Sequence, residues 1–282
     1  MRLGANIFTK YDGPEEFVRL HAEKGYSAAY CPNGVSVCGD TTLIGAYKAA
    51  LEKANIVIAE VGAWCNPLSR DEKTAKEAVD HVISRLALAD EIGAKACVNI
   101  IGTWHDSHWF APAADNFSAD FFDYAVEVSR KIIDAVKPKH TKMTFEIMPY
   151  SFLDSAAEYL RFLKALDRRE AGVHFDPANC INCPRLYYDN AAFFKRELAL
   201  IGDKIVSVHL KDLVLHPESP AVHLEEVPIG QGGLDYVSLL KLLNTLPKDT
   251  PVMLEHLPDE QAYDSAAENV RSFAAQASAA LI

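Results

Sequence analysis

Eight short apolar segments alternate with amphipathic segments along this chain of 282 residues, and this alternation limits the fold more than any other feature. Several of the segments are nearly continuous hydrophobic runs, which is typical of parallel strands that are covered on both faces. The expected strands are residues 3–8, 27–31, 57–63, 96–102, 143–148, 171–176, 205–210 and 252–257.

Helical patterns fill the intervals between these strands. Apolar periodicity predicts helices over residues 14–25, 42–54, 121–136, 191–201 and 236–246. Ser-x-x-Glu capping boxes at residues 69–72, 155–158 and 265–268 predict the starts of three more. Eight strand-plus-helix units predict a closed (β/α)8 barrel with parallel strands, with residues 1–282 forming a single domain, since such barrels use about 250 residues.

An open, doubly wound sheet is the alternative fold. It usually carries a Gly-rich phosphate-binding turn after its first strand. The first expected strand is followed by Thr-Lys-Tyr-Asp instead, which favours the barrel.

Composition excludes several classes of protein. Hydrophobic residues make up 49% and charged residues 24% of the chain, as in ordinary soluble globular proteins. No run of about 18 apolar residues is present, so no membrane span is expected. The first residues lack a secretory pattern, which predicts a cytoplasmic protein. A formal charge of −11, from 39 acidic and 28 basic residues, argues against a nucleic-acid partner, whose phosphates require clustered Lys and Arg.

Four metal-binding side chains occur near the ends of four successive expected strands. They are Glu146, Asp176, His209 and Glu255, separated by 30, 33 and 46 residues, which is roughly one strand-plus-helix unit each. A carboxylate inside an apolar strand is costly to bury unless it is paired or binds a metal. Each residue alone is equally consistent with a strand-end salt bridge, but the four together predict one divalent-metal site at the C-terminal face of the barrel.

Hard oxygen ligands with a single imidazole are typical of Mn²⁺ or Mg²⁺, while Co²⁺ and Zn²⁺ stay open. Such an ion can polarise a substrate carbonyl, and a glutamate can then remove the neighbouring proton to give an enediolate. Return of the proton to the opposite face would be an epimerisation, and return to the adjacent carbon an isomerisation. Loss of a leaving group would make the enzyme a lyase or dehydratase.

Three motifs add a family resemblance. HxKD at residues 209–212, PIGQGGLDY at 228–236 and FDPAN at 175–179 resemble segments of the xylose-isomerase-like barrel superfamily of sugar isomerases and epimerases. The resemblance covers nearly the whole chain. In the ketose 3-epimerase members, the matching Glu, Asp, His and Glu bind one divalent metal, and both Glu move protons. The resemblance therefore implies metal ligation by Glu146, Asp176, His209 and Glu255, and catalysis by Glu146 and Glu255.

Two positions depart from the ketose 3-epimerase pattern. Asn179 stands where those members have a substrate-binding His, and Lys211 is the only cation near the position where they have an Arg. The superfamily also contains endonuclease IV-type DNA-repair enzymes, which use a His-rich, multi-zinc site. The histidines at 105, 108, 216 and 223 lie in expected loops of an acidic chain, which argues against that activity.

Further residues are expected to bind the substrate. Candidates are Lys211, Asn179, His105, His108, Trp104 and Trp64. Each candidate also has a purely structural alternative. Lys211 could form a salt bridge, the tryptophans could pack, and the histidines could simply lie exposed on the surface. Successive side chains of a strand point to opposite faces, so His256 is expected to point away from Glu255 and to pack behind the barrel.

The sequence therefore predicts a metal-dependent isomerase or epimerase acting on a keto-sugar or related polyol. The first alternative is a metal-dependent lyase or dehydratase acting at the same site on a keto-sugar, inosose or keto-glycoside. The second is a catalytically silent partner subunit. A homo-oligomer is compatible with each of them.

Overall fold

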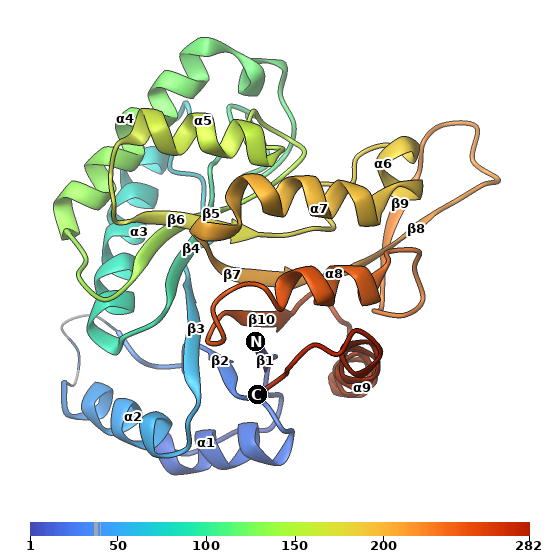
Figure 1. Cartoon of the computed structure of the whole chain (residues 1–282). Coiled ribbons are helices and arrows are strands. Elements are labelled where there is room, and N and C mark those ends of the chain that lie inside the picture. The colour runs from blue at the N-terminus through green and yellow to red at the C-terminus, as the bar shows by residue number, and fades with distance from the viewer. Residues whose placement is uncertain (37–38, 40) are drawn as a thin grey trace.

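Eight parallel strands close into one barrel in the computed structural model, which describes residues 1–36, 39 and 41–282. The strand order around the barrel is β1-β10-β7-β6-β5-β4-β3-β2 (Figure 1). Its strands are β1 Arg2–Gly4, β2 Ala28–Tyr30, β3 Val57–Gly62, β4 Ala96–Ile100, β5 Lys142–Glu146, β6 Ala171–Phe175, β7 Ile205–Leu210 and β10 Pro251–Leu254. Because β1 pairs with both β10 and β2, the sheet has no open edge there, and the expected barrel is confirmed.

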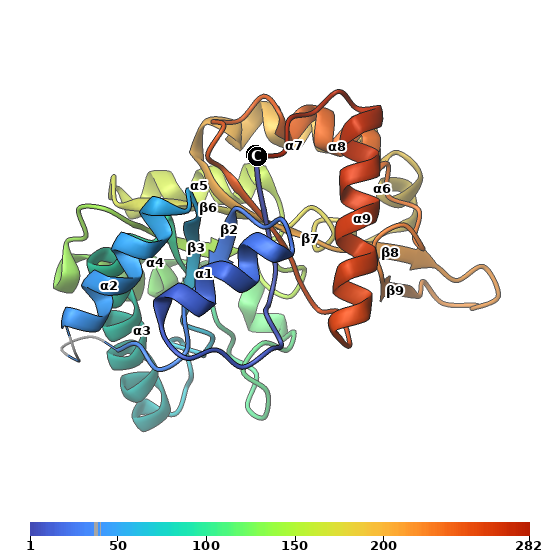
Figure 2. The same cartoon turned by 90° about the horizontal axis from the view of Figure 1, so that it is seen from below.

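Helices surround the strands, as the view from below shows (Figure 2). They are α1 Pro14–Glu23, α2 Thr41–Lys53, α3 Glu72–Ile92, α4 Ala119–Val136, α5 Ala156–Leu166, α6 Pro184–Tyr188, α7 Asn190–Ile201, α8 Tyr236–Leu243 and α9 Glu260–Gln276, with 3-10 turns η1 Ala114–Phe117 and η2 Gly202–Lys204. Their apolar faces pack on the outer faces of the strands and form the main hydrophobic core.

Two of the three expected helix starts are wrong. Ser155 does cap α5, since its hydroxyl accepts a hydrogen bond from the Glu158 amide. Helix α3 is capped by Asp71, two residues after the expected Ser69. Helix α9 starts at Glu260 and is capped by Asp259, so the expected capping box at 265–268 lies inside the helix. An Asp side chain caps a helix as well as a Ser side chain does, because its carboxylate can accept a hydrogen bond from the backbone amide three residues later.

Most expected strands extend too far toward their C-terminal ends. β1 ends at Gly4 rather than at residue 8, and β10 ends at Leu254 rather than at 257. At His256 the backbone enters the left-handed region, with φ +56. Strand pairing stops at these points, although Ile7 and Phe8 continue the apolar run after β1.

The segment after β7 is a β-hairpin rather than the expected long loop. It consists of β8 Asp212–Leu215 and β9 Leu224–Val227, which pair antiparallel. The hairpin projects from the barrel beyond α6 (Figures 1 and 2). Its base is fixed by the buried Asp212 carboxylate, which accepts hydrogen bonds from the amides of Leu213, Gly230, Gly232 and Leu234 at 2.9–3.2 Å. This contact connects the Asp of HxKD with the glycine-rich turn that follows it.

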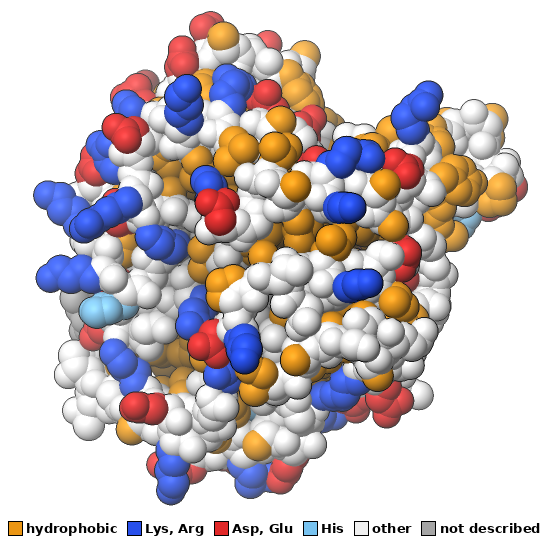
Figure 3. Space-filling view, viewed as in Figure 1, with side chains coloured by type: hydrophobic (Ala, Val, Ile, Leu, Met, Phe, Trp, Pro, Cys, Tyr) orange, Lys and Arg blue, Asp and Glu red, His pale blue; other side chains and the backbone are white. Residues whose placement is uncertain are grey.

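The surface carries both signs of charge. On the face drawn in Figure 3, Lys and Arg side chains lie interspersed with Asp and Glu. Among the described residues, no helix combines the length and the apolar character that crossing a bilayer would require.

Candidate metal centre

Glu146, Asp176, His209 and Glu255 meet at the C-terminal end of the barrel. Glu146 is the last residue of β5, Asp176 follows β6, His209 lies near the end of β7 and Glu255 follows β10. One ligand atom from each lies within 4.8 Å of the others. We name these four residues the candidate metal centre.

Lys211 lies among the carboxylates of this centre. Its ammonium is 3.2 Å from Glu146 Oε1, 2.8 Å from Asp176 Oδ2 and 2.7 Å from Glu255 Oε2. The side chain is buried, and burial by itself would lower its pKa, but these three carboxylates raise it well above its ordinary value. The Lys211 charge therefore offsets part of the negative charge of the centre.

The carboxylates respond differently to the same surroundings. Burial acts to raise the pKa of Glu146, but Lys211 and the His209 hydrogen bond outweigh burial and hold that pKa well below its ordinary value. Burial also opposes ionisation of Glu255, yet His209 lowers its pKa to about 2. For Asp176 burial prevails and raises the pKa to about 6. Both glutamates are thus carboxylates near neutral pH.

His209 connects the centre to a further buried carboxylate, Glu60 of β3. Its Nδ1 lies 3.3 Å from Glu146 Oε1 and 2.9 Å from Glu255 Oε2, while its Nε2 lies 3.2 Å from Glu60 Oε1. A hydrogen bond donated from Nε2 to Glu60 leaves Nδ1 directed at the centre. The sequence interpretation missed Glu60, although a Glu inside the apolar run 57–61 is the same signal that identified Glu146.

The residues of the centre suit a divalent cation. Asp176 Oδ1 accepts the Asn179 amide at 3.0 Å, which orders the turn after β6. The other oxygen, Oδ2, and Glu255 Oε2 are buried and lie at ion-pair distance from Lys211, but among the described residues they accept no well-aligned hydrogen bond. Buried oxygens with unused acceptor capacity, three carboxylates and one imidazole form a donor set that fits Mn²⁺ or Mg²⁺.

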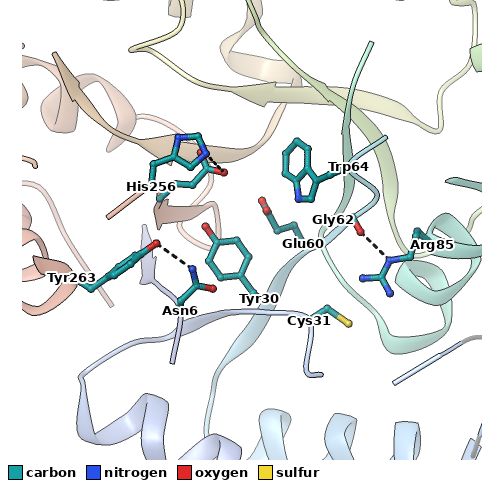
Figure 4. Close-up of a pocket in the computed structure, with 10 residues that line it drawn as sticks. Asn6, Tyr30, Cys31, Glu60, Gly62, Trp64, Arg85, His256 and Tyr263 are labelled. Atoms are coloured by element: carbon teal, nitrogen blue, oxygen red, sulfur yellow. Dashed lines mark hydrogen bonds and ion pairs between the residues drawn. The ribbon is translucent and has the colours of Figure 1, made fainter. Parts of the chain in front are cut away.

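Two cavities reach the centre, and Trp64, Glu255 and His256 line both of them. The first, of about 420 Å³, is lined by Asn6, Tyr30, Cys31, Glu60, Gly62, Trp64, Arg85, Glu255, His256 and Tyr263 (Figure 4). The second, of about 520 Å³, is lined by Trp64, Ile100, Trp109, Phe110, Glu146, Met148, Tyr150, Asn179, Lys211, Glu226, Glu255 and His256. Gly62 has no side chain, and this allows the Trp64 ring to lie against the end of β3 between the cavities.

Three of the expected substrate-binding residues line a cavity at the centre. Trp64 and Lys211 are described above. Asn179 donates from Nδ2 to Glu146 Oε1 at 3.2 Å, so it contacts a residue of the centre directly.

The other three expected residues lie elsewhere. Trp104 packs edge-on against Phe121 and under the guanidinium of Arg70, and it lines a separate surface pocket between α3 and α4. His105 accepts the amide of His108 in an exposed turn, and neither histidine lines the two cavities. The structure does not bring these three residues to the two cavities, because the connection after β4 folds back on itself, and sequence position alone does not reveal that.

His256 also differs from expectation. Rather than packing behind the barrel, it lines both cavities, and its Nδ1 lies 3.2 Å from Glu226 Oε2 of β9. The strand has already ended at Leu254, so strict alternation no longer applies, and the positive φ turns the side chain toward the mouth. Glu226 and Tyr150 were missed as lining residues for a similar reason, because they lie on segments outside the barrel strands.

A comparison with known proteins shows to which family the chain belongs. Residues 30–273 match the family model described as xylose isomerase-like TIM barrel. The chain belongs to this family. The identification confirms the resemblance that the three motifs indicated.

Three similar proteins are distant in sequence from this chain. A probable L-ribulose-5-phosphate 3-epimerase of Mycoplasma pneumoniae is 24% identical over 141 residues, a match that spans 50% of this chain and 42% of that protein. A D-psicose 3-epimerase structure determined in the presence of D-fructose superposes with a TM-score of 0.71 and 13% identity, over 99% of this chain and 100% of the other. A xylose isomerase-like protein from Mycobacterium smegmatis in complex with magnesium superposes with a TM-score of 0.67 and 15% identity, over 99% of this chain and 97% of the other. These structures share the fold.

Proposed function

We propose that this protein is a divalent-metal-dependent sugar epimerase or isomerase that acts on a keto-sugar or a related polyol. The observation that carries the proposal is the pair Glu146 and Glu255, which share one buried centre with Asp176 and His209 and line the same cavity. The epimerase relatives in the xylose isomerase-like family support the same class of reaction. The structure of a family member in complex with magnesium supports a divalent ion.

The four residues of the centre would hold the ion through carboxylate oxygens and His209 Nδ1. A bound Mn²⁺ or Mg²⁺, or alternatively Co²⁺ or Zn²⁺, would supply Lewis-acid polarisation of a substrate carbonyl. Glu60 would hold the His209 ring in place through Nε2, and Asn179 would orient Glu146. The charge of Lys211 would limit repulsion among the three carboxylates and would also be available to a substrate oxygen.

Proton transfer would then be the work of the two glutamates. One glutamate, as a carboxylate, removes the proton next to the substrate carbonyl and leaves an enediolate. The other glutamate, after taking up a proton from solvent, donates it to the opposite face, inverts the carbon and is left as a carboxylate. In the free protein both are ionised near neutral pH, because the charges of Lys211 and His209 favour their carboxylate forms, so either can act first as the base. If the same glutamate returned the proton to the neighbouring carbon, the reaction would be an aldose–ketose isomerisation.

The cavity walls suit a carbohydrate. Trp64, Trp109, Phe110 and Tyr150 line the larger cavity beside polar groups of Lys211, Asn179 and Glu226. Aromatic rings can stack on the apolar C–H faces of a sugar, while polar side chains bond its hydroxyls. Of the residues expected from sequence to bind substrate, we retain Trp64, Asn179 and Lys211 in this role.

The decisive experiment uses glutamate-to-glutamine substitutions. Glu146→Gln and Glu255→Gln keep an oxygen ligand but remove the base, so each should lower turnover by at least about 10²-fold. Metal occupancy should fall less than in His209→Ala, which removes a ligand. The assay incubates the protein with Mn²⁺ and a panel of ketoses, ketose phosphates, keto-glycosides and inososes in D₂O, and follows exchange by NMR.

The matched control is Glu127→Gln on the exposed face of α4, which should leave turnover unchanged. Loss of inversion in one active-site variant, with continued exchange of the proton of one epimer, would assign each glutamate to a face. Near-normal turnover in both variants with metal bound would refute the two-glutamate mechanism.

The same experiment separates the alternative functions. A lyase or dehydratase would form an unsaturated product from an inosose or keto-glycoside instead of an epimer. A silent partner subunit would exchange no substrate proton and would purify without a stoichiometric divalent ion. The intact pair of glutamates favours an enzyme over the silent subunit.

A further inference from the structure

The projecting hairpin carries a second group of metal-binding side chains, separate from the candidate metal centre. His216 directly follows β8 and His223 directly precedes β9. The His216 amide donates to the His223 carbonyl at 3.0 Å, so the two residues extend the antiparallel ladder by one pair. Their rings are stacked with centroids 4.6 Å apart and an interplanar angle of 23°. Both imidazoles therefore lie on one face of the hairpin.

A carboxylate completes this group. Glu225 lies two residues after His223, so its side chain points to the same face of the hairpin. Its Oε2 forms a short contact with His216 Nε2, and a ligand atom from each of His216, His223 and Glu225 lies within 4.8 Å of the others. On the opposite ring nitrogen, His216 Nδ1 lies 2.9 Å from Glu218 Oε1. Two imidazoles and one carboxylate can thus surround a single point, while Glu218 orients the His216 ring from behind.

We infer that His216, His223 and Glu225 form a surface site that binds one Zn²⁺ ion or a chemically similar divalent ion such as Cu²⁺ or Ni²⁺. Two imidazoles and one carboxylate are a common protein ligand set for Zn²⁺, with water in the fourth position. Imidazole-rich sites favour Zn²⁺, Cu²⁺ or Ni²⁺ over Mg²⁺, whereas the carboxylate-rich candidate metal centre has the opposite preference. The contact from His216 Nδ1 to Glu218 is the kind of outer hydrogen bond that fixes a ligating ring. Because a ligating imidazole nitrogen must be deprotonated, binding would release to solvent any proton carried by His216 Nε2.

Because of its position on the hairpin, this site would affect the wall of the larger cavity. Side chains alternate along β9, so Glu226, next to Glu225, points the other way, lines the larger cavity and bonds His256 at 3.2 Å. The other strand, β8, begins directly after Lys211. An ion bound by His216 and His223 would cross-link the two strands and hold this cavity wall in one arrangement.

The test measures Zn²⁺ binding in a background without the candidate metal centre. In the double variant Asp176→Asn/His209→Ala, calorimetric titration with ZnCl₂ should detect one equivalent at micromolar concentrations, while MgCl₂ should give no heat from this site. Adding His216→Ala or His223→Ala to the double variant should abolish the binding of this one equivalent of Zn²⁺. His140→Ala, an exposed histidine elsewhere, should leave it in place. Because two of the four central ligands, Asp176 and His209, are removed, this titration reports on the hairpin site, and failure here would leave the proposed sugar chemistry untouched.

A second measurement uses the unmodified chain and does not depend on the folding of the double variant. The imidazole ¹⁵N resonances of His216 and His223 should shift together when Zn²⁺ is added, and those of His140 should not. The inference is overturned if these resonances do not move. It is equally overturned if His216→Ala and His223→Ala bind as much Zn²⁺ as their parent.

Discussion

At the scale of single residues, Glu60 contacts the candidate metal centre from outside through His209. It is buried in β3 and contacts the face of His209 that points away from the other carboxylates. Its second oxygen lies 3.8 Å from His174 Nδ1, and His174 in turn bonds Ser207 at 2.6 Å. Carboxylates that receive the outer N–H of a ligating histidine orient the ring and raise its basicity.

We therefore predict that Glu60→Gln lowers the affinity for Mn²⁺ by about 10- to 100-fold, the usual effect of losing such a partner. Gln keeps the size of the side chain, so circular dichroism should show an unchanged fold. Calorimetric titration of metal-free protein with MnCl₂ measures the effect, with Glu127→Gln as the matched surface control. An unchanged dissociation constant would show that Glu60 serves packing alone.

Lys211 supports a second prediction at this scale. Its ammonium contacts three carboxylates in a buried site, and removing one partner of a buried ion pair typically costs about 3–5 kcal/mol. Lys211→Met should therefore lower the melting temperature of EDTA-treated protein. Added Mn²⁺ should raise the melting temperature of the variant more than that of the parent, since the ion replaces the lost positive charge. Equal melting temperatures in EDTA would contradict this account of Lys211.

At the scale of elements, α9 tests which residue starts a helix. Asp259 accepts the Ala262 amide at 2.9 Å, whereas Ser265 lies on an exposed turn inside the helix. Asp259→Ala should destabilise the protein by about 1 kcal/mol through loss of the cap. Ser265→Ala should be neutral or stabilising by a few tenths of a kcal/mol, because Ala is the better helix former. Urea denaturation of both variants measures the difference, and the opposite order would restore the expected start at the 265–268 capping box.

At the scale of the whole molecule, stability and chemistry are expected to separate between the two ends of the barrel. Arg2 is buried at the N-terminal end, where it bonds Asp249 Oδ1 at 2.7 Å, the Asn55 carbonyl at 2.6 Å and Asn55 Oδ1 at 2.8 Å. These contacts connect the start of β1 to the segments that lead into β10 and β3. The candidate metal centre lies at the opposite end of the same strands.

Arg2→Met should therefore lower the free energy of unfolding by about 2–4 kcal/mol, because the hydrogen bonds from its buried, charged guanidinium to Asp249 and Asn55 are lost. Mn²⁺ affinity and turnover, measured at a temperature where the variant is folded, should stay within about twofold of the parent, since the centre is untouched. A large loss of metal affinity in the folded variant would show that the two ends are coupled.

The sequence alone determined the barrel and the four residues of the candidate metal centre. Both depend on local signals, namely strand and helix periods and a charged residue inside an apolar run. Glu60 carried the same signal and was overlooked. Strand ends were less predictable, because an apolar run can continue past the last paired residue, as at residues 5–8 after β1.

Only the tertiary structure decided which residues surround the centre. Trp64 and Trp104 follow adjacent strands and look equivalent in sequence, yet Trp64 lines both cavities and Trp104 packs between outer helices. His256 and Glu226 reach the cavity from a left-handed turn and from a hairpin that the sequence had indicated as a loop. Periodicity reports which face of a strand or helix is buried. Where irregular connections fold back is set by contacts between segments far apart in the chain, which no local pattern encodes.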